Sequence, residues 1–311
     1  MPTLLISTWE DGVFVVDGGE LRHELIGRPT RGLAAGDGRV LAILDEHSLC
    51  ERTRDGAWQE IARSESPLST CLITRGEVFV GTDDDAHLLR LSAGTLSRVD
   101  GFDRTPGRET WEPGGALIDG KWMGPPLGIR SMTAAPDGGV LLANVHVGGI
   151  PRSTDRGATW HPTIEIGADV HEVAFHPSRP EIVAAAAAIG LCVSRDGGAT
   201  WRTETEGLDH SHCSAVAFVG DDILVSASDG PFAEQGAVYR RPVDGAGPLK
   251  PVSGGLPRWT DRRVDTANIG VRGPNAAIAD GGGNVYLSED AGVRWERVAH
   301  GIAAPSAVVF L

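Results

Sequence analysis

A short motif of the form S-x-D-x-G-x-x-W occurs three times in this chain of 311 residues. The copies span Ser153 to Trp160, Ser194 to Trp201 and Ser288 to Trp295. Their tryptophans lie 41 and 94 residues apart, so the second gap is close to two repeats. A degenerate copy, T-R-D-G-A-W, runs from Thr53 to Trp58. A period of this length predicts an array of similar small units, each of which buries its hydrophobic face against the next.

Each residue type in the motif has a role in a tight strand-turn-strand corner. The glycine tolerates a positive φ, and the aspartate and serine side chains hydrogen-bond to the backbone of the turn. The tryptophan buries a large apolar area between strands. We therefore interpret these residues as structural and assign no catalysis to them.

The three copies resemble those of the Asp-box (BNR) repeat family of β-propellers, which includes sialidases, sortilin, xyloglucanases and a photosystem assembly factor. The resemblance implies an all-β fold, a β-propeller. Counting the strand segments predicts a single seven-bladed propeller of four-stranded antiparallel blades over residues 1–311. Alternating strand and turn segments define six blades, at residues 28–65, 66–103, 128–168, 169–208, 209–257 and 264–301. Residues 3–27 supply three more strands, and residues 305–311 supply the fourth. The C-terminal strand is thus expected to join the N-terminal blade and close the ring.

Composition excludes several classes of partner. The 42 glycines and 19 prolines are typical of short elements joined by turns, and the net charge of −14 disfavours nucleic acid and anionic membranes as partners. The longest apolar run, residues 182–193, is too short to span a bilayer. The four cysteines lack paired spacing, and the N-terminus lacks the pattern of a signal peptide. We expect a cytoplasmic protein with reduced thiols.

The propeller topology sorts the remaining loops by face. The connection between blades and the loop between the second and third strands of a blade emerge on one face, here called the upper face. The four motif corners belong to the opposite, lower face. Four tryptophans outside the motif map to upper loops, where they suit either ligand contact or packing against the blades: Trp9, Trp111, Trp122 and Trp259. The insertion at residues 102–127 holds two of them and is predicted to form a lid over the channel.

Histidines also gather at the predicted upper face. His146, His171 and His212 come from three adjacent blades, close to the ends of inner strands. They are candidate ligands for a divalent transition metal with an open position, and His210 or Glu46 would then handle the proton. The alternative is that these histidines are polar residues that satisfy backbone groups of the turns.

Three arginines occupy corresponding places. Arg31, Arg130 and Arg263 lie in or just before the innermost strands, where converging guanidinium groups would hold a carboxylate or a phosphate. Acidic residues on neighbouring upper loops include Asp83, and Asp265 lies just after Arg263. These acidic residues either pair with the arginines as a solvated rim or act as acid and base.

Sialidase chemistry does not match the sequence. That family uses a tyrosine nucleophile and an F/Y-R-I-P signature; the signature is absent here, and the two tyrosines, Tyr239 and Tyr286, map to third strands away from the mouth. The first hypothesis is therefore a propeller that binds a small polar or anionic ligand through the three arginines, with Trp111, Trp122 and Trp259 excluding water. The alternatives are a metal-dependent hydrolase, lyase or isomerase and a protein-interaction scaffold that uses the upper rim.

Overall fold

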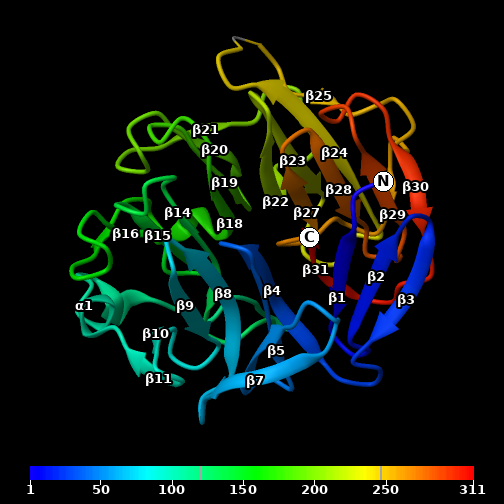
Figure 1. Cartoon of the computed structure of the whole chain (residues 1–311). Helices are drawn as coiled ribbons and strands as arrows, with labels where there is room; N and C mark the ends of the chain where they lie inside the picture. The colour runs from blue at the N-terminus through cyan, green and yellow to red at the C-terminus, as the bar shows by residue number, and fades with distance from the viewer. Residues whose placement is uncertain (119–120, 246) are drawn as a thin grey trace.

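The computed structural model describes residues 1–118, 121–245 and 247–311, and the side chains of residues 116–122 lie outside the description. Seven four-stranded antiparallel sheets stand around a central channel as the blades of a β-propeller (Figure 1). This confirms the predicted fold and the predicted blade boundaries. The strands of the first three blades are β1 (Leu4–Thr8), β2 (Val13–Asp17), β3 (Glu20–Glu24), β4 (Thr30–Gly36), β5 (Arg39–Leu44), β6 (Ser48–Arg52), β7 (Trp58–Arg63), β8 (Leu68–Thr74), β9 (Glu77–Thr82), β10 (Leu88–Ser92) and β11 (Thr95–Arg98).

The other four blades follow the insertion, and the C-terminal strand returns to the first. Their strands are β14 (Ile129–Ala134), β15 (Leu141–Val145), β16 (Pro151–Ser153), β17 (His161–Pro162), β18 (Val170–Phe175), β19 (Val183–Ala187), β20 (Gly190–Ser194), β21 (Arg202–Glu204), β22 (His212–Val219), β23 (Asp222–Ser228), β24 (Gln235–Pro242), β25 (Lys250–Pro251), β27 (Ile269–Arg272), β28 (Asn275–Ala279), β29 (Val285–Ser288), β30 (Glu296–Ala299) and β31 (Pro305–Phe310). A fifth strand, β26 (Thr260–Asp261), pairs with β24 at its upper end.

The ring closes as the sequence predicted. Strand β31 is the innermost strand of the first blade and pairs antiparallel with β1 in the register Leu4↔Phe310 and Ile6↔Val308. Because β31 pairs with β1, the inner edge of β1 is not left without a hydrogen-bonding partner strand.

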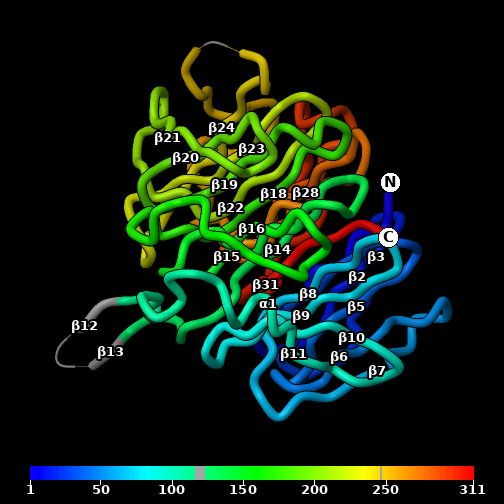
Figure 2. The backbone as a smooth tube through the Cα atoms, turned by 90° about the vertical axis from the view of Figure 1, so that its left-hand side faces the viewer, coloured from blue at the N-terminus to red at the C-terminus, as the bar shows by residue number. Residues whose placement is uncertain are grey.

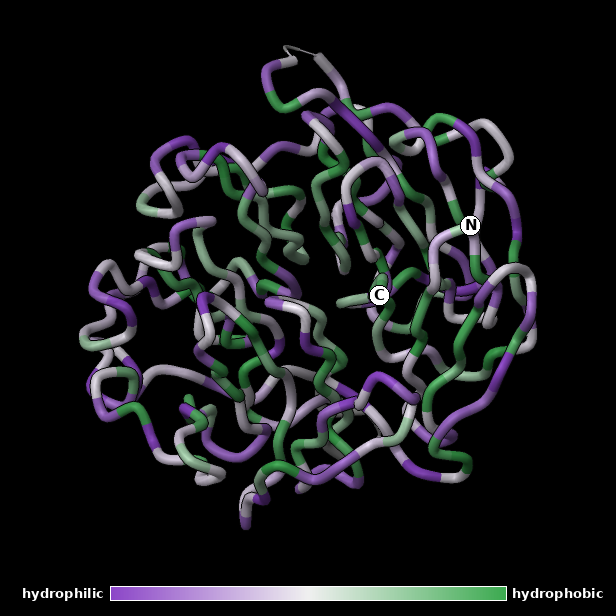
Figure 3. The backbone as a smooth tube through the Cα atoms, in the orientation of Figure 1, coloured by the Kyte–Doolittle hydropathy of each residue, from purple (hydrophilic) through white to green (hydrophobic). Residues whose placement is uncertain are grey.

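Hydrophobic packing fills the spaces between neighbouring blades. Hydrophobic stretches follow the strands, and hydrophilic ones concentrate in the outer turns (Figure 3). One cluster joins the third and fourth blades, where Phe102 meets the edge of Trp160 at a ring-centroid distance of 5.2 Å. All four cysteines are buried and free. In the described residues no helix is long and apolar enough to cross a membrane.

The motif corners share one hydrogen-bond pattern. In the first corner the backbone N–H of Gly157 donates to the Ser153 hydroxyl (2.8 Å), and the backbone N–H of Thr159 donates to Oδ1 of Asp155 (2.8 Å). Gly157 has a φ of +89°, which explains the invariable glycine within the three copies. The corners beginning at Ser194 and Ser288 repeat these bonds. All connect the third and fourth strands of a blade, so they lie together on the lower face.

Acid is expected to weaken these corners. Hydrogen bonds from the Thr159 side chain and backbone lower the pKa of Asp155 to about 2, from 3.8 in an unfolded chain. Such a carboxylate stabilises the fold above pH 3.8, and the contribution disappears as the pH falls to about 2. Asp155→Asn should therefore lower the urea midpoint at neutral pH, and its difference from the wild type should shrink between these two pH values.

A matched control is Asp229→Asn, which changes an exposed carboxylate of an upper loop. Its urea midpoint should follow that of the wild type at every pH. A difference between Asp155→Asn and the wild type that stays constant down to pH 2 would contradict the proposed role of the Asp155 carboxylate.

Candidate functional site

The upper end of the central channel holds a cavity of about 240 Å³. Its wall comes from the innermost strands β4, β8, β14 and β31 and from residues 263–268 just before β27. The three predicted arginines, Arg31, Arg130 and Arg263, all line this cavity, although they come from blades far apart in the sequence. The ring arrangement of the innermost strands brings them together (Figure 1).

β-Bulges explain how these side chains reach the site. The pairing of β14 with β15 shifts between Ile129 and Ser131, so Arg130 is an extra residue in its strand. The pairing of β18 with β19 shifts in the same way between Val170 and Glu172, which makes His171 the extra residue there. Bulges bend a strand and re-aim its side chains. The innermost strands therefore present chemically active side chains at their upper ends, where the regular alternation of the sheet is broken.

The arginines are held by two acidic residues. Arg31 Nη1 donates to Oδ2 of Asp83 (2.7 Å), and Arg263 Nη2 donates to Oδ2 of Asp265 (2.6 Å). Arg130 Nη2 lies 3.4 Å from the other oxygen of Asp265. Among the described lining residues, three guanidinium groups thus face two carboxylates.

Burial affects the two carboxylates differently. Burial raises the pKa of Asp83, and the nearby Arg31 opposes that rise. For Asp265 burial also acts to raise the pKa, but the charges of Arg130 and Arg263 outweigh it and the pKa is lowered. Asp265 is therefore the anionic partner shared by two arginines. Glu46 lies at the rim, 3.5 Å from Arg31 Nη2, and its side chain is largely exposed.

Beside the arginines lies a row of three histidines. The ring centroids of His146 and His171 are 5.3 Å apart, and those of His171 and His212 are 4.7 Å apart. Asp169, which the sequence analysis did not single out, reaches between the first two, with its Oδ1 3.0 Å from His146 Nε2 and 3.7 Å from His171 Nε2. Arg130 Nη1 donates to His146 Nε2 (3.1 Å) and so connects the histidine row to the cavity.

The histidines are neutral at physiological pH. Burial lowers the pKa of His146 and His212, and burial together with the charge of Arg130 lowers the pKa of His171 to about 3. Neutral imidazoles carry a free nitrogen lone pair, which is the form that binds metals and accepts protons. His210, in contrast, is exposed and precedes β22.

The predicted aromatic residues divide between contact with the cavity and packing. Trp9 lines the cavity and is 49% exposed, with the Arg31 guanidinium 5.8 Å from its ring. Trp111 is only 7% exposed, because its ring packs on Phe102 and anchors the insertion to a blade. Trp259 is 38% exposed and stacks with Arg258 at 4.2 Å. The side chain of Trp122 lies outside the described residues. Of the three upper-loop tryptophans whose side chains are described, Trp9 is the one that lines the cavity.

The residues on either side of the hairpin in the insertion lie near the channel mouth. It contains the short helices α1 (Asp100–Asp103) and η1 (Arg108–Thr110) and the hairpin of β12 (Ala116–Ile118) and β13 (Lys121–Met123). Pro125 lines the cavity, and Gly114 lies so close to His146 that a Cβ atom there would overlap the imidazole ring. In Figure 2 the hairpin projects at the left of the molecule, opposite the two chain termini. Pro125, after the hairpin, and Gly114, before it, therefore lie beside the site, and the predicted lid stays a prediction.

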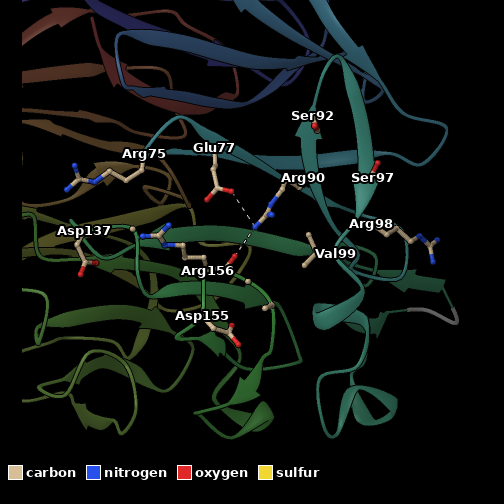
Figure 4. Close-up of a pocket in the computed structure, with 13 residues that line it drawn as sticks. Arg75, Glu77, Arg90, Ser92, Ser97, Arg98, Val99, Asp137, Asp155 and Arg156 are labelled. Atoms are coloured by element: carbon tan, nitrogen blue, oxygen red, sulfur yellow. Dashed lines mark hydrogen bonds and ion pairs between the residues drawn. The ribbon is translucent and has the colours of Figure 1, made fainter.

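A second cavity, of about 720 Å³, lies on the lower face between the third and fourth blades. It is lined by charged side chains that include Arg75, Arg90 and Arg156 (Figure 4). Arg90 donates to the carbonyl oxygen of Arg156 (2.8 Å), lies 3.5 Å from Glu77 and covers the Phe79 ring. Arg75 donates to the carbonyl oxygen of Pro136. These bonds connect neighbouring blades, so we interpret this groove as a structural junction.

Sequence reasoning missed Asp169 and Glu172. Glu172 accepts the backbone N–H groups of Val216 (2.9 Å) and Ala267 (3.1 Å), and burial raises its pKa to about 8. Both acidic residues flank His171 in the run D-V-H-E, which crosses the bulge of β18. The signal was an unusual density of polar residues at the start of an otherwise apolar inner strand.

Fold and site together define a seven-bladed β-propeller with a charged channel mouth. Solved structures with similar folds include an ancestral GH74 enzyme (TM-score 0.64, 15% identity, 91% of this chain and 38% of that one). A GH74 enzyme from Niastella koreensis (TM-score 0.61, 13% identity) is matched over 96% of this chain and 47% of its own. The GH74 xyloglucanase from Xanthomonas campestris (TM-score 0.53, 18% identity) is matched over 86% and 43%.

These likenesses show the fold alone. The chain spans less than half of the length of each of these three enzymes. A computationally designed protein, Ika8, is also similar in fold (TM-score 0.58, 14% identity, 97% of this chain and 86% of that one). No protein-family model matches the sequence, and no curated protein matches it.

Proposed function

We propose that this propeller binds a small polar molecule with one carboxylate or phosphate group in the cavity at the upper end of its channel. The observation that carries the proposal is the convergence of Arg31, Arg130 and Arg263 on one cavity, whose lining residues also include the carboxylates of Asp83 and Asp265. A guanidinium group is suited to planar, bidentate recognition of such anions. An anion bound here would contact guanidinium groups that already line the cavity.

Cavity size limits the ligand. The volume of about 240 Å³ is below the range of about 300–1,000 Å³ that is usual for ligand pockets. A xyloglucanase, by its name, acts on a polysaccharide, but a long glycan would not fit into this cavity as a whole. The proposal is therefore a molecule of the size of a monosaccharide acid or smaller, with Trp9 as the apolar surface at the entrance.

The scaffold hypothesis has weaker support. It requires the aromatic residues of the insertion to form one exposed patch, and Trp111 is buried against Phe102. Trp9 and Trp259 are exposed, but they come from different blades and each has an arginine partner. The small-ligand proposal accounts for more of the charged groups at the channel mouth than the scaffold hypothesis does.

A thermal unfolding screen tests the proposal. The probes are glucuronate with glucose as its neutral counterpart, lactate and inorganic phosphate. A ligand at about 100 times its dissociation constant is expected to stabilise the protein by about 2.7 kcal/mol. Arg130→Ala and Arg263→Ala should each abolish the shift, because each removes a charged group from the cavity wall.

The matched control is Arg22→Ala on the outer strand β3, whose side chain is largely exposed. It should keep the full ligand response. Each variant is compared with its own ligand-free melting temperature, which separates lost binding from lost stability. Shifts that persist in both cavity variants, or equal shifts with glucuronate and glucose, would contradict an anion site formed by these arginines.

A further inference from the structure

We propose that His146, Asp169 and His171 form a binding site for one divalent transition-metal ion next to the arginine-lined cavity. The site is separate from the cavity of the proposed ligand, because its three residues are not among those that line that cavity. The atoms are Nε2 of His146, Oδ1 of Asp169 and Nε2 of His171, and they all lie within 4.8 Å of one another.

The donor separations suit a small cation. Ligands about 2.0–2.1 Å from a tetrahedral metal ion lie about 3.3 Å from each other. The observed distances to Oδ1 of Asp169 are 3.0 Å from His146 and 3.7 Å from His171, one on each side of that value. The third separation, between the two imidazole nitrogens, is at most 4.8 Å, so a cation would have to draw the donors together to make them three corners of a coordination tetrahedron. The fourth position would be left for water or a substrate atom, as in catalytic metal sites.

Hydrogen bonds identify the ring nitrogens of His146 and His171 that carry no proton. His171 Nδ1 lies 2.6 Å from the carbonyl oxygen of Cys213, so it carries the proton and Nε2 is the free acceptor. A metal-bound histidine usually donates its other ring N–H to a carbonyl or carboxylate oxygen in this way. His146 Nε2 accepts a hydrogen bond from Arg130, so it carries no proton to give to Asp169.

Three electron-rich atoms thus face one another in a buried place. Among the described residues Oδ1 of Asp169 makes no hydrogen bond, although it is shielded from solvent. The two histidines are only 5% and 3% exposed. An unpaired carboxylate oxygen beside two unprotonated imidazole nitrogens, one of which accepts a hydrogen bond from Arg130, is unfavourable in such surroundings. A bound cation would remove this repulsion and supply the missing partner.

The donor set favours a transition metal over calcium or magnesium. Imidazole nitrogen suits Zn²⁺, Co²⁺, Ni²⁺ and Fe²⁺, whereas Mg²⁺ and Ca²⁺ take mainly oxygen ligands. His212 lies beside His171, and its Nε2 is buried with no partner in the described part of the chain. The proposed site therefore uses Asp169 as the third ligand, and His212 lies beside one of the two histidine ligands.

Arg130 connects this site to the cavity. Its Nη1 occupies the lone pair of His146 that the cation needs, while its Nη2 already lies 3.2 Å from the Thr266 hydroxyl and 3.4 Å from Asp265. A metal ion that binds His146 would displace the guanidinium group from the ring. Removal of this competitor by Arg130→Met should therefore strengthen metal binding and at the same time weaken anion binding in the cavity.

Metal titration of the whole chain tests the site. Protein without a histidine tag is treated with a chelator, dialysed and titrated with Co²⁺ and Zn²⁺ by calorimetry and visible spectroscopy. We expect one ion per chain and the intense visible absorption of tetrahedral Co²⁺. Asp169→Asn and His171→Ala should each weaken binding by more than about 100-fold, which exceeds the 10–100-fold cost of losing an outer-shell partner.

Controls separate this site from other histidines and from misfolding. His161→Ala changes an exposed histidine on the outer strand β17 and should bind as the wild type does. Asp169→Asn keeps a residue that tolerates the left-handed backbone found there (φ +49°), so it is expected to fold if His171→Ala does not. Absence of binding to the wild type, or binding that survives both ligand changes, would overturn the proposal. The anion screen would then still decide the proposed function by itself.

Discussion

Deletion of residues 304–311 is expected to abolish the cooperative unfolding transition of the whole propeller. The deletion removes β31, which is the innermost strand of the first blade and pairs along the full length of β1. Val308 and Phe310 are buried in the core between blades and contribute about 1.5–3 kcal/mol each by burial alone. The new open edge at β1 adds to that loss, against a typical total stability of about 5–15 kcal/mol.

The measurement is urea unfolding followed by tryptophan fluorescence, together with size-exclusion chromatography. The shortened chain should elute as aggregate or as an expanded species without a sharp transition. A chain that lacks only Leu311, which lies outside β31 and is partly exposed, should behave as the wild type does. A sharp transition at the wild-type urea midpoint in the longer deletion would show that ring closure does not stabilise the fold.

Trp160→Ala is expected to destabilise the protein by about 3–5 kcal/mol, the usual cost of truncating a buried aromatic residue. Trp160 is only 3% exposed and packs against Phe102 between two blades. Its indole N–H also donates to the carbonyl oxygen of Gly157 (3.0 Å), so the change removes a contact inside the corner. Urea unfolding gives the difference in the free energy of unfolding.

Two other tryptophans calibrate this result. Trp9→Ala removes a half-exposed ring from the upper face and should cost less than about 1 kcal/mol. Trp201→Ala changes the same position of the repeat, but Trp201 is only partly buried and donates to the Thr163 hydroxyl instead of its own corner glycine. Its cost should lie between the other two. Equal losses for Trp160 and Trp9 would contradict the structural role assigned to the motif tryptophan.

The sequence predicted the architecture well because the repeat is a local signal. Serine, aspartate, glycine and tryptophan at set spacing define a corner whose hydrogen bonds lie within eight residues, so they can be inferred without distant contacts. The period of the corners and the count of strands then predicted seven blades and the closing strand. The upper position of the arginines followed from the same topology.

The candidate site was less predictable, because its distances depend on blades far apart in the chain. Arg130 and Asp265 are separated by 135 residues, and nothing in the spacing of either shows that they share an ion pair. Bulges add to the difficulty, since they re-aim His171 and Arg130 against the regular alternation of the strand. Trp111 illustrates the opposite case, because an aromatic residue in a long insertion became a packing anchor.

The amino-acid sequence by itself thus determined the seven-bladed ring, its closure by β31 and the separation of its two faces, since these depend on short-range turn chemistry repeated along the chain. Only the tertiary structure decided which charged groups meet. It placed Asp169 between His146 and His171 and brought three guanidinium groups to one cavity at the channel mouth, because these contacts arise where strands from different blades converge on one axis.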